Sequence, residues 1–123
     1  MIKRRQTTQS FVKDTGIGSE SPISVQSMTT TKTEDPQATL FQIKELEEAG
    51  CDIVRVTVNN RRAVRALPEI LAGAQIPVVA DIHFDHRLAL EAVEAGIHKI
   101  RINPGNIGSE DKVSRVLDAC RQA

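Results

Sequence analysis

Short apolar runs alternate along the chain with longer segments in which apolar residues recur every three or four positions. Runs of this length are typical of buried strands, and the periodic segments are typical of amphipathic helices. The predicted strands span residues 23–28, 53–58, 77–82 and 99–102, and the predicted helices span residues 36–49, 61–72, 86–95 and from 110 nearly to 123. The sequence therefore predicts a strand followed by a helix, four times over.

Capping residues stand at the boundaries of these predicted helices. Asp, Asn and Ser side chains accept hydrogen bonds from free N–H groups of a first turn, and glycine readily adopts the left-handed conformation that ends a helix. The predicted capping residues at the helix starts are Asp35, Asn60, Asp85 and Ser109, and the glycines at the helix ends are Gly50 and Gly96. Pro68 lies inside the second predicted helix, where we expect it to kink or split the helix because proline lacks an N–H donor.

The residues before the first repeated unit have a weaker pattern. Residues 2–12 alternate weakly between apolar and polar side chains, which indicates a small β-hairpin. Residues 16–22 are rich in glycine, serine and proline and are typical of a turn. The chain is thus expected to begin with a short amino-terminal hairpin.

Alternating strands and helices with apolar strands predict an α/β fold with a parallel sheet. Both a flavodoxin-like sheet and half of a (β/α)8 TIM barrel have this order of elements. Gly50, Gly73 and Gly96 are spaced evenly, 23 residues apart, and this regularity favours the barrel. A closed barrel needs about 250 residues, so residues 1–123 are interpreted as the first four βα units, an amino-terminal half-barrel.

An arginine interrupts two of the otherwise apolar strands. Arg55 and Arg101 each lie five residues past a glycine, at the same position of alternate units. A buried guanidinium group is costly without an anion beside it. The two arginines therefore suggest a site for a doubly charged anion, although either one could instead face outward and be solvated.

Further polar residues gather at the carboxyl ends of the predicted strands, where barrel enzymes place their sites. Guanidinium forks match phosphate oxygens, and amides orient phosphate or hydroxyl groups. The predicted ligand contacts are Arg55, Arg101, Asn103, Gln26 and Ser27, and the predicted catalytic residues, which would handle a proton or a hydroxyl, are Asp81 and His83. Asp81 has the alternative role of a structural partner of an arginine.

Composition excludes several other classes of protein. The formal net charge is zero, whereas non-specific nucleic-acid binding needs a basic excess. No apolar run is long enough for a membrane span. Cys51 and Cys120 lie far apart and form no metal motif, as expected in a reducing cytoplasm. His86 and His98 are interpreted as solvated surface residues.

Four sequence strings carry a family resemblance. SPISVQSMTTTKT, AGCDIVRVTV, VADIHFDHRLAL and RINPGNIG occur in order between residues 21 and 108, within a resemblance that covers roughly residues 16–108. Together they resemble the amino-terminal part of the 4-hydroxy-3-methylbut-2-enyl diphosphate synthases, iron–sulfur oxidoreductases of the methylerythritol phosphate route to isoprenoids. The resemblance implies a (β/α)8 barrel that binds 2-C-methyl-D-erythritol 2,4-cyclodiphosphate, with Arg55 and Arg101 on the diphosphate and Asp81, His83 and Asn103 in the same pocket.

The resemblance also implies features that lie outside this chain. These are the second barrel half, a separate domain with a [4Fe–4S] cluster, a homodimer, and ferredoxin or flavodoxin as electron donor. The three cysteines and the glutamate that hold the family's cluster have no counterpart here, so no metal ligand is predicted in this chain and the segment alone is expected to be inactive. Two alternatives are a non-catalytic anion-binding half-barrel and a pterin-binding barrel synthase or methyltransferase.

Overall fold

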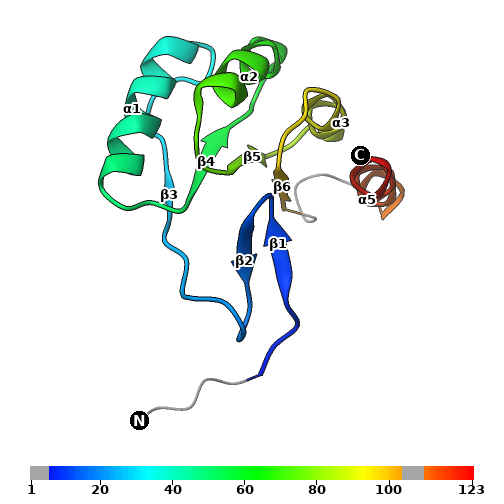
Figure 1. Ribbon diagram of the computed structural model, residues 1–123. Coiled ribbons are helices and arrows are strands. Elements are labelled where there is room, and N and C mark those ends of the chain that lie inside the picture. Colours follow the sequence, from blue (N-terminus) through cyan, green and yellow to red (C-terminus); the bar gives the residue numbers. More distant parts are fainter. Residues whose placement is uncertain (1–5, 104–109) are drawn as a thin grey trace.

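The computed structural model describes residues 6–103 and 110–123. They form a small hairpin followed by a parallel sheet that is covered by helices (Figure 1). The hairpin strands are β1 (Ser10–Val12) and β2 (Thr15–Ile17). The sheet strands are β3 (Gln26–Met28), β4 (Ile53–Thr57), β5 (Val78–Ile82) and β6 (Lys99–Ile102), and the helices are α1 (Pro36–Glu48), α2 (Arg61–Gly73), α3 (His86–Glu94) and α5 (Glu110–Gln122). The predicted cap Ser109 lies outside the described residues.

The order of the strands decides between the two folds that the sequence left open. The sheet runs β3-β4-β5-β6 in chain order, and all of its pairs are parallel. Figure 1 shows the helices in an arc around one side of these strands. A flavodoxin-like sheet has helices on both faces, so the prediction of TIM-barrel architecture with an amino-terminal hairpin is confirmed.

The two faces of the sheet differ in what covers them. On one face, Val54, Val56 and Ala80 pack with residues of the helices in the main hydrophobic core. The other face, which we call the inner face, carries a small apolar cluster in which Val12 of the hairpin packs on Ile53 and Val79. Because this cluster lies toward the amino ends of β4 and β5, the carboxyl-end half of the inner face is left for polar side chains.

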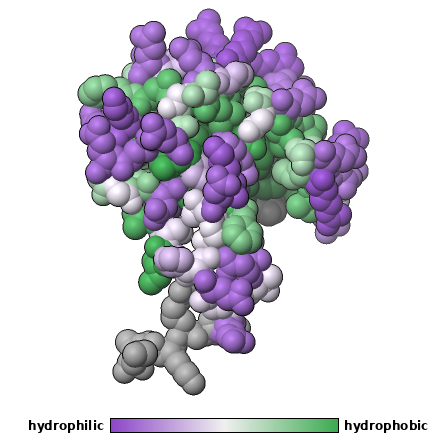
Figure 2. All heavy atoms as spheres, in the orientation of Figure 1, coloured by the Kyte–Doolittle hydropathy of each residue, from purple (hydrophilic) through white to green (hydrophobic). Residues whose placement is uncertain are grey.

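Hydrophilic residues dominate the outer surface over the helices in Figure 2, with hydrophobic residues visible between them. This is the surface expected of helices that bury one apolar stripe against a sheet. No helix in residues 6–103 and 110–123 has the length and apolar character needed to cross a lipid bilayer.

The predicted caps of the first three helices are confirmed. Asp35 accepts a hydrogen bond from the N–H of Ala38 at 3.1 Å, and Asn60 accepts one from the N–H of Ala63 at 2.9 Å. Gly50 and Gly96 follow α1 and α3 with φ of 96° and 93°, in the left-handed region that favours glycine. Local sequence therefore sets where these helices begin and end.

Replacing the cap Asp35 by Ala is expected to lower the free energy of unfolding by about 1 kcal/mol, because the N–H of Ala38 loses its acceptor. Urea denaturation followed by circular dichroism measures the change. Replacing the neighbouring exposed Glu34 by Ala is the matched control, and an equal loss in both variants would contradict a capping role.

Several predicted boundaries are wrong. β2 contains Gly16 and Ile17, which were assigned to the turn, and β3 is limited to residues 26–28. Just before this strand, the N–H of Val25 donates to the side chain of Asp52 at 2.8 Å, while the carbonyl oxygen of Val25 still accepts from the N–H of Ile53 at 3.2 Å. α2 is one unbroken helix across Pro68; the fully buried Leu67 and Ile70 on either side of the proline fix both halves in the core.

His98 is also not the solvated residue that the sequence suggested. Its Nδ1 accepts a hydrogen bond from the N–H of Val78, at the start of β5, at 3.0 Å. Partial burial, and secondarily the charge of Lys13, hold the pKa of His98 below its ordinary value of 6.5. The folded state therefore favours the neutral imidazole that this hydrogen bond requires.

The lowered pKa of His98 predicts acid sensitivity. The unfolded chain binds the proton first, so this stabilisation is complete above pH 6.5 and is lost as the pH falls from 6.5 toward the folded-state pKa. A His98→Gln variant should show a flatter dependence of unfolding free energy on pH over this range, measured by urea denaturation. An unchanged pH profile would show that His98 does not contribute.

Candidate functional site

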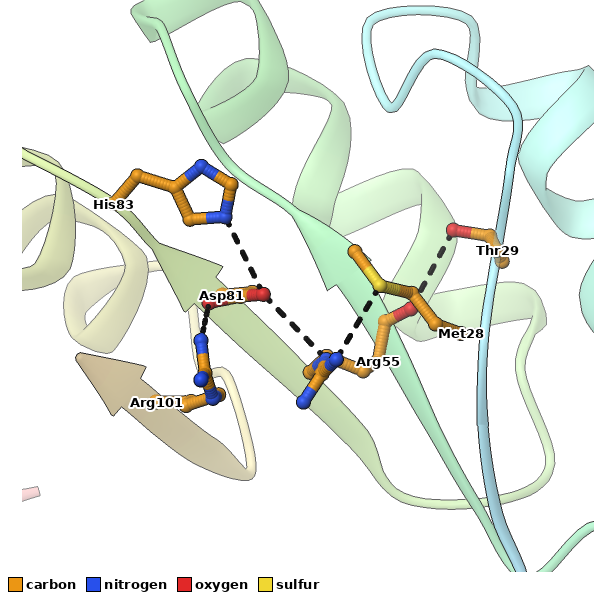
Figure 3. A network of polar contacts seen from close by, with 6 residues as sticks. All are labelled: Met28, Thr29, Arg55, Asp81, His83 and Arg101. Carbon is orange, nitrogen blue, oxygen red and sulfur yellow. Dashed lines mark hydrogen bonds and ion pairs between the residues drawn. The ribbon is translucent and has the colours of Figure 1, made fainter. Parts of the chain in front are cut away.

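Four charged or titratable side chains converge on the carboxyl-end half of the inner face. They come from three adjacent strands and the residue just beyond one of them, and we call them the Asp81 cluster: Arg55 of β4, Asp81 of β5, His83 after β5, and Arg101 of β6. Figure 3 shows the two arginines approaching Asp81 from opposite sides and His83 approaching from beyond the strand end. Sequence reasoning predicted each of these residues, and the structure brings all four together.

Strand alternation places them there. In β4, Val54 and Val56 are fully buried against the helices, so Arg55 between them points to the inner face. In β5, Ala80 and Ile82 face the helices in the same way and leave Asp81 on the inner face. Arg55 and Asp81 therefore point to the inner face because their apolar neighbours in the strand pack in the core on the opposite face.

Both oxygens of Asp81 are in contact with cations. Arg101 Nη1 donates to Asp81 Oδ1 at 2.9 Å, whereas Arg55 Nε lies 3.5 Å and His83 Nε2 lies 3.4 Å from Asp81 Oδ2. The Asp81 side chain is only 3% exposed, while those of Arg55 and Arg101 are 29% and 49% exposed. Two guanidinium groups against one carboxylate leave the cluster with a net positive charge.

The donors of Arg55 are poorly used. Its Nε is buried and has no hydrogen-bond partner among the described residues; its contact with Asp81 Oδ2, at 3.5 Å, is an ion pair. Its Nη2 donates to the thioether sulfur of Met28 at 3.5 Å, and such a sulfur is a weak acceptor. Arg55 is therefore able to bind a stronger acceptor, such as a phosphate oxygen, that enters the cluster.

The backbone around Arg55 is held firmly. Thr29, at the end of β3, donates its N–H to the carbonyl oxygen of Arg55 at 3.0 Å. The following loop is fixed to α1, because Gln42 Oε1 accepts the N–H groups of Thr30 and Thr31 at 2.7 and 3.3 Å. These contacts connect the first helix to the strand that carries Arg55.

The equal positions of the two arginines in the repeat do not correspond to one level in the sheet. Arg55 pairs with Val79, whereas Arg101 pairs with Asp81 two residues further along β5. Arg101 therefore lies closer to the carboxyl ends than Arg55 does. The offset places the guanidinium groups on successive levels of one face, both within reach of the same carboxylate.

The other predicted ligand contacts are placed differently. Gln26 pairs with Ile53 and so shares the inner face, but it lies toward the amino end from Arg55. Ser27 pairs with Val54, whose side chain belongs to the helix-facing core, and the structure does not bring Ser27 to the cluster. Asn103 follows the end of β6, two residues beyond Arg101.

Met28 is a member of the site that sequence reasoning missed. It pairs with Arg55 across the sheet and contacts the guanidinium group. The available signal is the alternation in β3, which puts Met28 on the same face as Gln26.

A separate ion pair lies at the rim, beyond β5. Asp85 accepts the N–H of Arg87 at 3.0 Å, and the Arg87 guanidinium donates to both carboxylate oxygens of Asp85 at 3.1 Å. These hydrogen bonds from Arg87 hold the pKa of Asp85 below its ordinary value of 3.8. Because Asp85 and Arg87 neutralise each other, they leave the charge of the Asp81 cluster unchanged.

The described residues do not fit a metal or an iron–sulfur cluster. No group of three or more His, Cys, Asp and Glu side chains in residues 6–103 and 110–123 has a suitable arrangement. Cys51 is buried, with its Sγ donating to the carbonyl oxygen of Ile53 at 3.0 Å, and Cys120 is exposed on α5. Neither thiol lies in the Asp81 cluster.

Comparison with known families identifies the domain that carries these residues. Residues 7–123 match the family model described as the GcpE TIM-barrel domain. The chain belongs to the GcpE TIM-barrel family. Membership confirms the resemblance that the four sequence strings indicated.

Curated relatives in the GcpE family agree. The chain is 56% identical over 122 residues to a protein of Maridesulfovibrio salexigens and 54% identical over 121 residues to one of Ruminiclostridium cellulolyticum. Both are named "4-hydroxy-3-methylbut-2-en-1-yl diphosphate synthase (flavodoxin)". These matches cover 99% and 98% of this chain but 34% of each relative, so the chain spans about a third of their length.

Solved structures show the same architecture at low sequence identity. Two mandelate oxidase structures superpose with TM-scores of 0.57 and 0.54 at 16% identity. The matches cover 80% and 82% of this chain and 40% and 46% of those chains. At this identity the likeness concerns the fold alone.

Proposed function

We propose that this chain is the amino-terminal half of a barrel that binds an organic diphosphate, and that the Asp81 cluster is its diphosphate site. The observation that supports this most directly is the pair of inner-face arginines, Arg55 and Arg101, with one buried carboxylate between them. Arg55 has donors that lack a strong acceptor, and phosphate oxygens accept well from guanidinium groups.

The names of the relatives suggest the reaction of the whole protein. We infer a reductive synthase that converts 2-C-methyl-D-erythritol 2,4-cyclodiphosphate into (E)-4-hydroxy-3-methylbut-2-enyl diphosphate. Two electrons and two protons open the ring and release one hydroxyl as water. The diphosphate is retained throughout, so a site that grips it holds substrate and product alike.

The residues divide into two roles under this proposal. Arg55 and Arg101 bind the diphosphate, and the amides of Asn103 and Gln26 orient it or a hydroxyl group. Of the predicted catalytic pair, His83, 38% exposed, is the member that the opening reaches and that handles a proton or the departing hydroxyl. Asp81, 3% exposed, supports it through the 3.4 Å contact between Asp81 Oδ2 and His83 Nε2. Ser27 is left out of the pocket because its strand position faces the helices.

The remaining parts of the proposed enzyme lie outside this chain. They are the second half of the barrel and a domain with a [4Fe–4S] cluster, which would supply the electrons when it is bound. We propose flavodoxin or ferredoxin as the electron donor, a homodimer for the full-length protein, and a cytoplasmic location. This chain alone is expected to bind diphosphate without turnover.

Anion binding tests the proposal. Isothermal titration calorimetry of the chain with inorganic diphosphate and, separately, with sulfate at matched ionic strength should show tighter binding of diphosphate, because its two phosphoryl groups can engage both arginines. Equal affinity for the two anions would contradict a diphosphate site. Tighter binding of a pterin than of diphosphate would instead favour a pterin-binding barrel enzyme.

A further inference from the structure

Asp81 differs from the rest of its cluster in how its side chain is used. Its two oxygens face side chains of the protein itself: Oδ1 accepts from Arg101, and Oδ2 faces Arg55 and His83. At 3% exposure, the carboxylate has almost no surface with which to touch a ligand. The arginines, by contrast, are exposed enough to be reached from the opening.

We propose that Asp81 is a built-in counter-anion, a positioning residue that holds Arg55 and Arg101 in place before a ligand binds and competes with the ligand for them. This role rests on the proposed diphosphate site and deepens it. A diphosphate that enters the cluster needs the same guanidinium donors, and its negative charge is repelled by the carboxylate behind them. Asp81 therefore acts on the ligand through the arginines.

The geometry explains why such a residue is useful. Two guanidinium groups on neighbouring levels of one face repel each other, and burial makes the unpaired charge more costly. One carboxylate between them allows both to remain folded onto the inner face. The same carboxylate leaves a single net positive charge, which limits the affinity for a polyanion that must be released after the reaction.

An Asp81→Asn variant separates this role from a purely structural one. Asparagine keeps the shape and an acceptor for Arg101 but removes the negative charge. The variant should bind inorganic diphosphate about tenfold more tightly than the unmodified chain at the same pH and ionic strength. It should also unfold at a lower temperature without anion and regain stability when diphosphate is added.

Asp118→Asn is the matched control. Asp118 is exposed on α5, so the same chemical change adds the same charge to the protein away from the cluster. A variant at Asp81 that binds diphosphate no more tightly than the control, or more weakly, would overturn the proposal. Failure of the unmodified chain to bind diphosphate at all would instead refute the diphosphate site itself, so the two failures are distinguishable.

A second measurement uses the unmodified chain and tests the same role even if the Asp81→Asn variant does not fold. The unmodified chain is labelled with ¹³C at the aspartate carboxyl carbons, and the Asp81 resonance is assigned from backbone spectra. This resonance should shift when diphosphate is added, because the ligand draws the guanidinium donors of Arg101 and Arg55 away from the Asp81 carboxylate. The Asp118 resonance should not move. An Asp81 resonance that stays unchanged at saturating diphosphate would show that the carboxylate keeps its partners and does not compete.

Discussion

Replacing Leu67 by Ala is expected to lower the free energy of unfolding by about 2–5 kcal/mol. Leu67 is fully buried on α2, in the core between the helices and the sheet. Truncation removes the transfer free energy of the lost carbons and leaves a cavity that close-packed neighbours fill only in part. Since domains of this size are stable by about 5–15 kcal/mol, the loss is a large fraction of the total.

Urea denaturation followed by circular dichroism gives the measurement, and Leu117→Ala is the matched control. Leu117 is 50% exposed on α5, so the identical truncation there should change the free energy by about 0.5 kcal/mol or less. Similar losses at the two positions would mean that the packing of α2 on the sheet is not the main source of stability.

The sequence predicted the elements well where local chemistry decides them. Asp35 and Gly50 bound α1 as their types suggest, because capping depends on residues within one turn. The strand β6 has the predicted bounds. The predicted split of α2 at Pro68 is wrong for the opposite reason: the cost of one missing hydrogen bond is local, but the packing that outweighs it is tertiary.

The candidate site was predictable in membership but not in arrangement. The sequence assigned Arg55, Asp81 and Arg101 to one site at the carboxyl ends of the strands, and the structure brings them together. Sheet register is set by how whole strands pair, so the repeat did not reveal that Arg101, and not Arg55, lies level with Asp81. The contact of Met28 with Arg55 depends on the same register.

The hairpin also has a part in the site that its sequence alone did not indicate. Val12 covers Ile53 and Val79 at the amino ends of β4 and β5, and it does so on the face that carries the arginines. The hairpin thus covers the apolar part of the inner face and leaves the charged part open. Chain segments far apart in sequence together restrict a polar ligand to the carboxyl ends of the strands.

Removing both inner-face arginines should abolish diphosphate binding. Arg55→Ala and Arg101→Ala are each expected to weaken the affinity for inorganic diphosphate about 10- to 100-fold, because each removes charge-assisted hydrogen bonds to the ligand. The double variant reverses the sign of the cluster, since Asp81 then stands without either guanidinium group. Calorimetric titration should detect no binding by this variant.

Two further variants test whether the loss of binding is specific to the two inner-face guanidinium groups. Arg62→Ala removes the same charge from an exposed position on α2 and should leave the affinity nearly unchanged, because surface charges at a distance are screened by salt. Arg101→Lys keeps the charge but loses the planar fork, so its affinity should fall between those of the unmodified chain and Arg101→Ala. If Arg62→Ala weakened binding as much as Arg55→Ala, diphosphate would be responding to overall charge, and the two guanidinium groups that meet at Asp81 would not form its site.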